Sequence, residues 1–146
     1  MKTPELYHGT SVNDIEILEP RLPRNRRSSG DEVPVVCASD DIDYAIFMAI
    51  IGDRAWGGWS KKEFGDKGFY VYDDYAATLS LSEYEQPDGL VYFLDNSTFE
   101  TENSIEWRSK EPVKVLGSIA VGVMDLPHFA ICTEDSRYHY KTRRAK

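Results

Sequence analysis

The second half of the chain constrains the fold most, because it is a succession of short segments rich in β-branched and aromatic residues. These segments span 68–75, 90–94, 104–108 and 113–123, and polar residues or prolines separate them. Segments of this length and composition are typical of single strands. The sequence therefore predicts a group of late strands that pair into sheets.

The chain begins with a predicted strand and a predicted short helix. Residues 5–9 have the composition of a strand. Ser11, followed three residues later by Asp14, resembles a capping box, the arrangement that starts many helices. We therefore expect a short helix through Leu18, which Pro20 ends.

A second strand and a second helix follow. Residues 33–38 form a β-branched run, and Ser39 or Asp40 is placed to cap a helix that Gly52 closes. The apolar residues of this helix fall on one face: Ile42, Ala45, Ile46, Ala49 and Ile50. This order of elements indicates an α+β fold. A length of 146 residues suits a single domain over 1–146, with a basic tail from about 138.

The charge of the chain argues against one class of function. The net charge is -8 and the isoelectric point is about 4.9, so a protein held to nucleic acid by phosphate neutralisation alone is not expected. Residues 20–30 are locally basic and rich in turn-forming residues, which predicts an exposed loop. This arginine loop carries Arg21, Arg24, Arg26 and Arg27.

Cysteine usage and hydropathy predict a cytoplasmic protein without a metal. Cys37 and Cys132 each lie in an apolar stretch, without a second cysteine or a histidine at metal-ligand spacing. Buried thiols are therefore expected rather than a zinc site or a disulfide. The sequence shows no secretory leader and no apolar run of about 18 residues, so we expect no membrane partner.

Two motifs carry the functional signal. The strand at 5–9 contains His8 followed by Gly9, and far downstream Glu106 precedes Trp107, with Pro112 six residues after the glutamate. In this order the motifs resemble the first and last motifs of the ADP-ribosyltransferase family, which includes poly(ADP-ribose) polymerases and the catalytic domains of diphtheria toxin and exotoxin A. The resemblance implies two small packed β-sheets that form an NAD cleft, with a few short helices.

The resemblance also implies roles in NAD cleavage. Glu106 is expected to hydrogen-bond the 2'-hydroxyl of the nicotinamide ribose, and either to stabilise an oxocarbenium-like transition state or to orient the acceptor. His8 is expected to hold a ribose hydroxyl of the adenosine half, and Gly9 to let the backbone approach the nicotinamide carboxamide. The other expected NAD contacts are Thr10, Ser39, and Arg21 and Arg24 of the arginine loop, whose guanidinium groups suit a pyrophosphate.

A middle motif matches the family only in part. Members of the family enclose the nicotinamide between two aromatic rings, one on a strand and one on the following helix. When Ala38 is placed on the alanine between them, Phe47 falls on the second ring position and Val36 on the first. One ring is therefore absent, and Tyr44 or Tyr7 is the substitute wall that the sequence offers.

Each functional assignment has a structural alternative. A strand histidine such as His8 also occurs with its ring satisfied by backbone, and most carboxylates of an acidic protein are solvated surface groups. Phe47 also suits the core, next to its apolar helix neighbours. Trp56 and Trp59 either line an acceptor or adenine site or close the end of a sheet.

The predicted function is an enzyme that binds NAD, cleaves the nicotinamide–ribose bond and transfers ADP-ribose to a protein, nucleic acid or small-molecule acceptor. One alternative is a non-catalytic module that binds NAD or ADP-ribose, which Val36 in place of a ring favours. Another is an RNA 2'-phosphotransferase, which shares the fold but is expected to have a more basic cleft. Ser104 stands where arginine-modifying members carry Glu or Gln, which disfavours arginine-directed transfer. The oligomeric state stays open.

Overall fold

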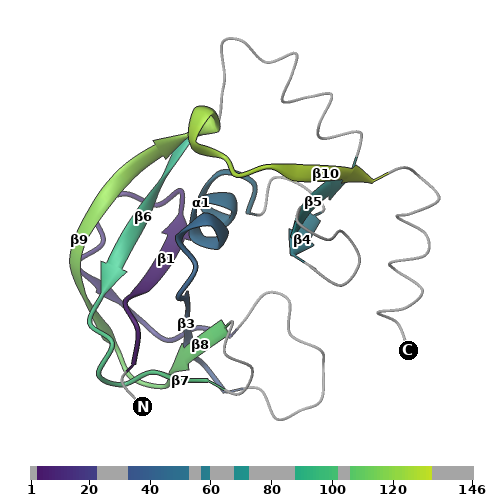
Figure 1. Ribbon diagram of the computed structural model, residues 1–146. Coiled ribbons are helices and arrows are strands. Elements are labelled where there is room, and N and C mark those ends of the chain that lie inside the picture. The colour runs from purple at the N-terminus through teal and green to yellow at the C-terminus, as the bar shows by residue number, and fades with distance from the viewer. Residues whose placement is uncertain are drawn as a thin grey trace.

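The computed structural model describes residues 3–22, 33–52, 57–59, 68–72, 88–101 and 106–132. These residues form an α+β fold with a large antiparallel sheet, a small sheet and one α-helix (Figure 1). The predicted α+β class is confirmed. No helix in these ranges is both long and apolar enough to cross a bilayer.

The large sheet has seven strands in the order β2-β9-β6-β1-β3-β8-β7, and the pairs between neighbours are antiparallel. Its strands are β1 (Leu6–Thr10), β2 (Ile17–Leu18), β3 (Val36–Ser39), β6 (Asp88–Leu94), β7 (Glu100–Thr101), β8 (Glu106–Ser109) and β9 (Val113–Gly122). The N-terminal strand β1 thus lies in the middle of the sheet, with β6 on one side and β3 on the other.

The small sheet has three strands in the order β10-β5-β4. Its strands are β4 (Gly57–Trp59), β5 (Phe69–Tyr72) and β10 (Phe129–Cys132). β5 pairs in parallel with β10 and antiparallel with β4. A short 3-10 helix, η1 (Val123–Asp125), connects the end of β9 to the segment that leads into β10.

The helix α1 (Ile42–Ile50) forms where the sequence predicts it, but the predicted caps Ser39 and Asp40 are wrong. Asp41 is the N-cap, and its Oδ1 accepts a hydrogen bond of 2.9 Å from the backbone N–H of Asp43. Gly52 follows the helix with φ of +38°, in the left-handed region that favours glycine. α1 packs on β1 and β6, and Phe47 stacks on Phe69 of the small sheet, with 4.9 Å between ring centroids. The helix therefore lies between the two sheets (Figure 1).

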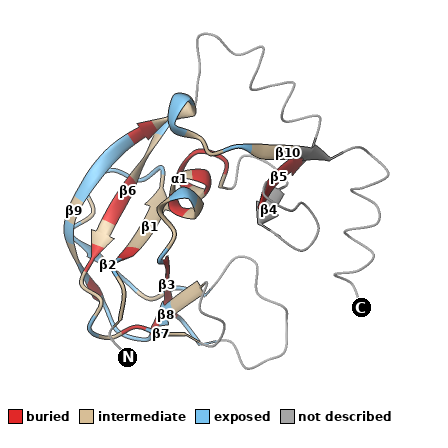
Figure 2. Cartoon of the chain, in the orientation of Figure 1, coloured by how far each residue is buried: buried red, intermediate tan, exposed pale blue. Residues whose placement is uncertain are grey.

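Two apolar cores cover the two faces of the large sheet. Figure 2 marks buried residues in red. The helix-side core contains Ala45, Phe47, Ala49, Ile50, Ile51, Phe69, Val71, Val91 and Val121. The strand-side core contains Leu6, Val36, Ala38, Tyr92, Leu94, Phe99 and Val113. Successive residues of one strand enter different cores, because side chains alternate between the faces of a sheet. Tyr92 and Val91 of β6 show this alternation.

The predicted helix from Ser11 to Leu18 is wrong. Its last residues form β2, and Asp14 has a φ of +59°, which no α-helix accommodates. Tyr92 of β6 explains the difference, because its hydroxyl donates a 2.7 Å hydrogen bond to the carbonyl of Val12. A tertiary contact thus holds this segment away from helical geometry. The structure also adds β4, β7 and β10, short strands that were not predicted.

Candidate functional site

The site is built around β1, whose two edges are paired very differently. β1 forms five register pairs with β6 but only one with β3, between Tyr7 and Ser39. β3 in turn forms four pairs with β8. Residues 8–10 of β1 and 36–38 of β3 therefore lie beyond the last pair that joins the two strands. We call this region the β1–β3 divergence.

His8 bridges the β1–β3 divergence with its side chain. Its Nδ1 lies 2.7 Å from the carbonyl oxygen of Cys37. A carbonyl can only accept, so Nδ1 carries the proton and donates. Burial lowers the pKa of the His8 ring, and the positive charge of Arg21 lowers it further, against the opposing effect of the Cys37 carbonyl. The ring is therefore neutral near pH 7, and its Nε2 is a hydrogen-bond acceptor.

Arg21 reaches this region through backbone pairing. Its N–H donates to the carbonyl of Val35 at 3.0 Å, and the N–H of Val35 donates back at 2.8 Å. This bridge places the exposed Arg21 beside the start of β3 and close enough for its charge to act on His8. Arg24, the other predicted pyrophosphate contact, lies outside the described residues.

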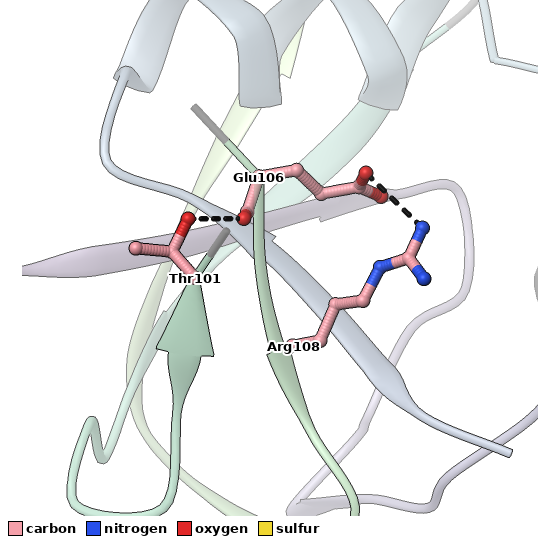
Figure 3. A network of polar contacts seen from close by, with 3 residues as sticks. All are labelled: Thr101, Glu106 and Arg108. Atoms are coloured by element: carbon pink, nitrogen blue, oxygen red, sulfur yellow. Dashed lines mark hydrogen bonds and ion pairs between the residues drawn. The ribbon is translucent and has the colours of Figure 1, made fainter. Parts of the chain in front are cut away.

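Glu106 enters the region from β8. It pairs with Ser39, and its backbone carbonyl accepts a 2.8 Å hydrogen bond from Oγ1 of Thr101 (Figure 3). Its Oε2 forms an ion pair of 3.3 Å with Nη2 of Arg108. The two side chains are 38% and 52% exposed, respectively, so this ion pair is a weak tether of about 0 to 1 kcal/mol. The carboxylate is therefore partly exposed to solvent.

Cys37 connects the two motif residues. Its carbonyl accepts a hydrogen bond from His8, and its thiol lies close enough to Glu106 for the carboxylate to raise the pKa of the thiol. Burial, together with the negative charge of Glu106, raises the pKa of the Cys37 thiol to about 11, so it stays protonated and can donate. Sequence analysis assigned Cys37 only as a buried thiol. Alternation was the available signal, because Val36 and Ala38 face the strand-side core and Cys37 must face the other way.

His8 and Glu106 reach β3 from opposite faces of the sheet. Tyr7, Ser39 and Glu106 are in register across three strands, so their side chains leave the same face, which α1 covers. His8 follows Tyr7 directly and pairs with Tyr92 of the strand-side core. The two predicted catalytic residues therefore flank Cys37 on either side of the sheet rather than sharing one face.

Three predicted NAD contacts have structural roles in the fold. An added Cβ on Gly9 would lie 1.8 Å from the carbonyl oxygen of Ala45, so the close packing of α1 on β1 requires a glycine there. Oγ of the buried Ser39 accepts a 3.0 Å hydrogen bond from the N–H of Asp41, which shapes the turn into α1. Oγ1 of Thr10 accepts a 3.2 Å bond from the N–H of Val12.

Both ring positions of the middle motif lie in the cores. Phe47 is 1% exposed and stacks on Phe69, and Val36 is 3% exposed in the strand-side core. Phe47 is therefore a core residue, which is the alternative to a nicotinamide-stacking role. Tyr44 and Tyr7, the substitute walls, are half-buried. Trp56 and the side chain of Trp59 lie outside the described residues.

A buried serine holds the turn after β8, between Glu106 and Pro112. Ser109 is fully buried, and its Oγ lies 2.7 Å from Oγ1 of Thr98. It also bonds the backbone N–H and carbonyl of Glu111, at 3.2 and 3.0 Å. This clamp holds the end of β8, so the strand that carries Glu106 is fixed at its far end.

An open cavity of the described part lies elsewhere. It has a volume of about 1020 Å³ and lies between residues 13–17 and strands β6 and β9, and neither His8 nor Glu106 lines it. Among the described residues there is no group of three or more side chains suited to hold a metal ion. Comparison with protein-family models, curated proteins and solved structures finds no match to this chain.

Proposed function

We propose that this chain binds NAD, cleaves its nicotinamide–ribose bond and transfers ADP-ribose, as an ADP-ribosyltransferase-like enzyme. One observation carries the proposal: His8 and Glu106, from motifs at opposite ends of the chain, flank Cys37 of β3, His8 through a hydrogen bond to its carbonyl and Glu106 through the charge that acts on its thiol. Two sheets around few helices are also what the resemblance implies.

The positions of the two residues suit the two halves of a dinucleotide. NAD is long enough to pass from one side of β3 to the other around the β1–β3 divergence. The neutral Nε2 of His8 would accept a hydrogen bond from a ribose hydroxyl of the adenosine half. Glu106 would then receive the nicotinamide ribose on the opposite face, and the exposed Arg21 would lie near the pyrophosphate between them.

Cleavage of the nicotinamide–ribose bond requires that the protein position NAD and place a negative charge near the ribose. The bond between ribose C1' and the nicotinamide nitrogen breaks, and nicotinamide leaves with the electron pair as a neutral molecule. The Glu106 carboxylate would bind the ribose 2'-hydroxyl and stabilise the positive charge that develops on the ring. The acceptor then forms a bond to C1' and loses a proton. Arg108 would orient the carboxylate for this step.

The Glu106→Gln variant tests the proposal. Gln keeps the shape but removes the charge, so nicotinamide release should fall at least about a hundredfold, while NAD affinity and the melting temperature change little. Glu111→Gln is the matched control, because Glu111 is an exposed glutamate in the turn just after β8. Wild-type turnover in Glu106→Gln, or an equal loss in Glu111→Gln, would refute the role of Glu106.

One observation favours a second candidate, a module that binds NAD or ADP-ribose without turnover. Neither Val36 nor Phe47 offers a ring face to a ligand, so the nicotinamide lacks the two-sided stacking of the family. Aromatic pairs contribute about 0.5 to 1.5 kcal/mol beyond burial, and a loosely held nicotinamide reacts slowly. Calorimetric titration with NAD, run beside an assay for free nicotinamide, separates the candidates: binding without release supports the module.

A further inference from the structure

The cavity of about 1020 Å³ lies where the chain before β2 leaves the edge of the large sheet. β2 pairs with β9 at Val113 and Lys114, and the N–H of Val115 donates to the carbonyl of Glu16 at 2.9 Å. None of the described residues 13–15 pairs with β9. The space between these residues and strands β6 and β9 is therefore left open to a ligand.

Tyr92 fixes the segment that forms one wall of this cavity. Its hydroxyl donates a 2.7 Å hydrogen bond to the carbonyl of Val12 and accepts one of 3.4 Å from the N–H of Ile15. Tyr92 is 3% exposed and belongs to the strand-side core, so packing sets the position of its ring. The wall is thus held by contacts within the fold, and a ligand does not have to order it.

The floor of the cavity is the strand-side face of β6 and β9. Tyr92 pairs with Ser118, so both side chains leave this face. Val115 packs against the strand-side core, and so does Leu90, which lies two residues before Tyr92. All four residues line the cavity. The floor therefore offers aliphatic and aromatic carbon with an exposed serine hydroxyl, which suits the apolar body of a small organic molecule.

Two carboxylates border this floor. Asp14 and Glu16 line the cavity, and both residues are exposed. Leu18 pairs with Val113 of the strand-side core, so Glu16, two residues before Leu18, faces the same side of the sheet. Neither carboxylate has an ion-pair partner within the described ranges. Both are therefore available to a cation.

Lys114 does not neutralise these carboxylates, although it also lines the cavity. It pairs with Ile17, which neighbours Glu16 and is 55% exposed, so the Lys114 side chain leaves the face opposite to that of Glu16. Its charge acts on Asp95 instead: hydrogen bonds from Ser97 lower the pKa of Asp95, and Lys114 lowers it further. The cavity face thus carries a negative charge, in a chain whose net charge is -8.

We propose that this cavity binds a small organic cation, a molecule that joins an apolar body to a protonated amine. The body covers the floor at Leu90, Tyr92 and Val115, and the amine reaches Asp14 and Glu16 at the rim. Ligand pockets commonly have volumes of about 300 to 1,000 Å³, so this cavity has room for a molecule larger than a single ring. Neither His8 nor Glu106 lines it, so this site is separate from the proposed NAD site.

Fluorescence titration with dansylcadaverine tests the site. This probe joins a naphthalene ring to a primary amine and brightens when its ring leaves water. N-pentyl dansylamide is the matched probe, because it keeps the ring and the chain but lacks the amine. Dansylcadaverine should bind about five- to tenfold more tightly, and added salt should narrow the difference. No binding of dansylcadaverine up to its solubility limit, or equal dissociation constants for the two probes, overturns the proposal.

A tryptophan on β9 tests the location. Ser118→Trp places a large ring on the cavity floor, so the dissociation constant of dansylcadaverine should rise at least about tenfold. Ala120→Trp is the matched control, because Ala120 is also exposed and leaves the same face of β9 but does not line the cavity. Melting curves check that both variants are folded. Equal losses of binding in the two variants would place the probe elsewhere and overturn the proposal.

Removal of the two carboxylates tests the charge without changing the shape of the cavity. The double variant Asp14→Asn/Glu16→Gln should bind dansylcadaverine as weakly as N-pentyl dansylamide, while the affinity of the neutral probe stays the same. Glu19→Gln/Asp40→Asn is the control with the same change in net charge, because both residues are exposed and neither lines the cavity. Unchanged preference for the amine in the first variant, or an equal loss in the control, overturns the role of the carboxylates.

Discussion

The two edges of β1 differ in how far they are paired: one edge is fully paired within the sheet, and the other borders the proposed site. Toward β6 every residue of β1 is in register, and α1 packs closely over this side. Toward β3 a single pair joins the strands, and beyond it a histidine side chain takes the place of backbone pairing. Side-chain groups at that edge are thus less committed to the sheet and can respond to a ligand.

This difference between the two edges predicts different roles for the adjacent residues His8 and Gly9. Gly9 serves the packed side, because the Ala45 carbonyl leaves no room for a side chain. His8 serves the open side, where its ring is held by one bond to Cys37 and keeps Nε2 as an acceptor. Substitutions on the packed side should therefore change stability, and those on the open side should change binding.

The largest expected effect is on the packed side, at Phe47. Phe47→Ala should lower the free energy of unfolding by about 3 to 5 kcal/mol, because it leaves a cavity between α1 and the small sheet. Phe47→Leu should be far milder and should keep the NAD affinity of the wild type. Denaturant unfolding and calorimetric titration measure both. A large loss of NAD affinity in a stable Phe47→Leu protein would show that Phe47 contacts the ligand and would contradict its assignment to the core.

Gly9→Ala comes next. A methyl group there overlaps the Ala45 carbonyl, so α1 must shift, which should cost about 2 to 3 kcal/mol of unfolding free energy. Gly122→Ala is the matched control, because an added Cβ at Gly122 meets nothing within 4 Å. Urea unfolding of the two variants gives the comparison. Equal stabilities would show that the helix does not depend on close contact with β1.

On the open side, His8→Ala should weaken NAD binding by about 1 to 2 kcal/mol, as expected for one lost hydrogen bond. The melting temperature should fall less than in Gly9→Ala. His8→Asn separates the two roles of the ring, because its amide can still donate to Cys37 but offers no group in place of Nε2. His8→Asn should therefore have a higher melting temperature than His8→Ala but the same weakened affinity for NAD. Unchanged NAD affinity in a folded His8→Ala protein would remove His8 from the site.

The smallest effect is the pH dependence of stability that His8 causes. Its pKa is lowered in the folded protein, so below about pH 6.5 the unfolded chain takes up a proton that the native ring does not. Stability from this residue is therefore present at neutral pH and declines as pH falls through that range. Urea unfolding at pH 7.5 and 5.5 should show a smaller decline in His8→Asn. A decline of equal size in both proteins would contradict the lowered pKa.

Local patterns predicted the elements that local interactions decide. Strand-like composition predicted β1, and the helical spacing of apolar residues predicted α1, because these signals lie within a few residues. The helix prediction after Ser11 was wrong because the hydroxyl of Tyr92, which is distant in sequence, donates a hydrogen bond to the carbonyl of Val12. The same limit applies to Phe47, since helical spacing marks an apolar face but does not say whether a core or a ligand covers it.

The candidate site was predictable as two motifs but not as an arrangement. His8 and Glu106 were identified from the residues around them, whereas their meeting depends on the strand order β1-β3-β8. No local signal encodes which strands become neighbours. Cys37 was missed as a connecting residue for this reason, because its importance comes from lying between two strands rather than from its own surroundings in the sequence.

The parallel pair between β5 and β10 has a consequence for the order of folding. Phe69 pairs with Phe129, so the small sheet can close only after a long stretch of chain has been brought back. Closing a long loop carries an entropic penalty before any contact rewards it, and such pairings form slowly. α1 and the strands on which it packs can therefore collapse first, with one side of the helix briefly bare. Pulsed hydrogen exchange during refolding should find β10 among the last strands to gain protection.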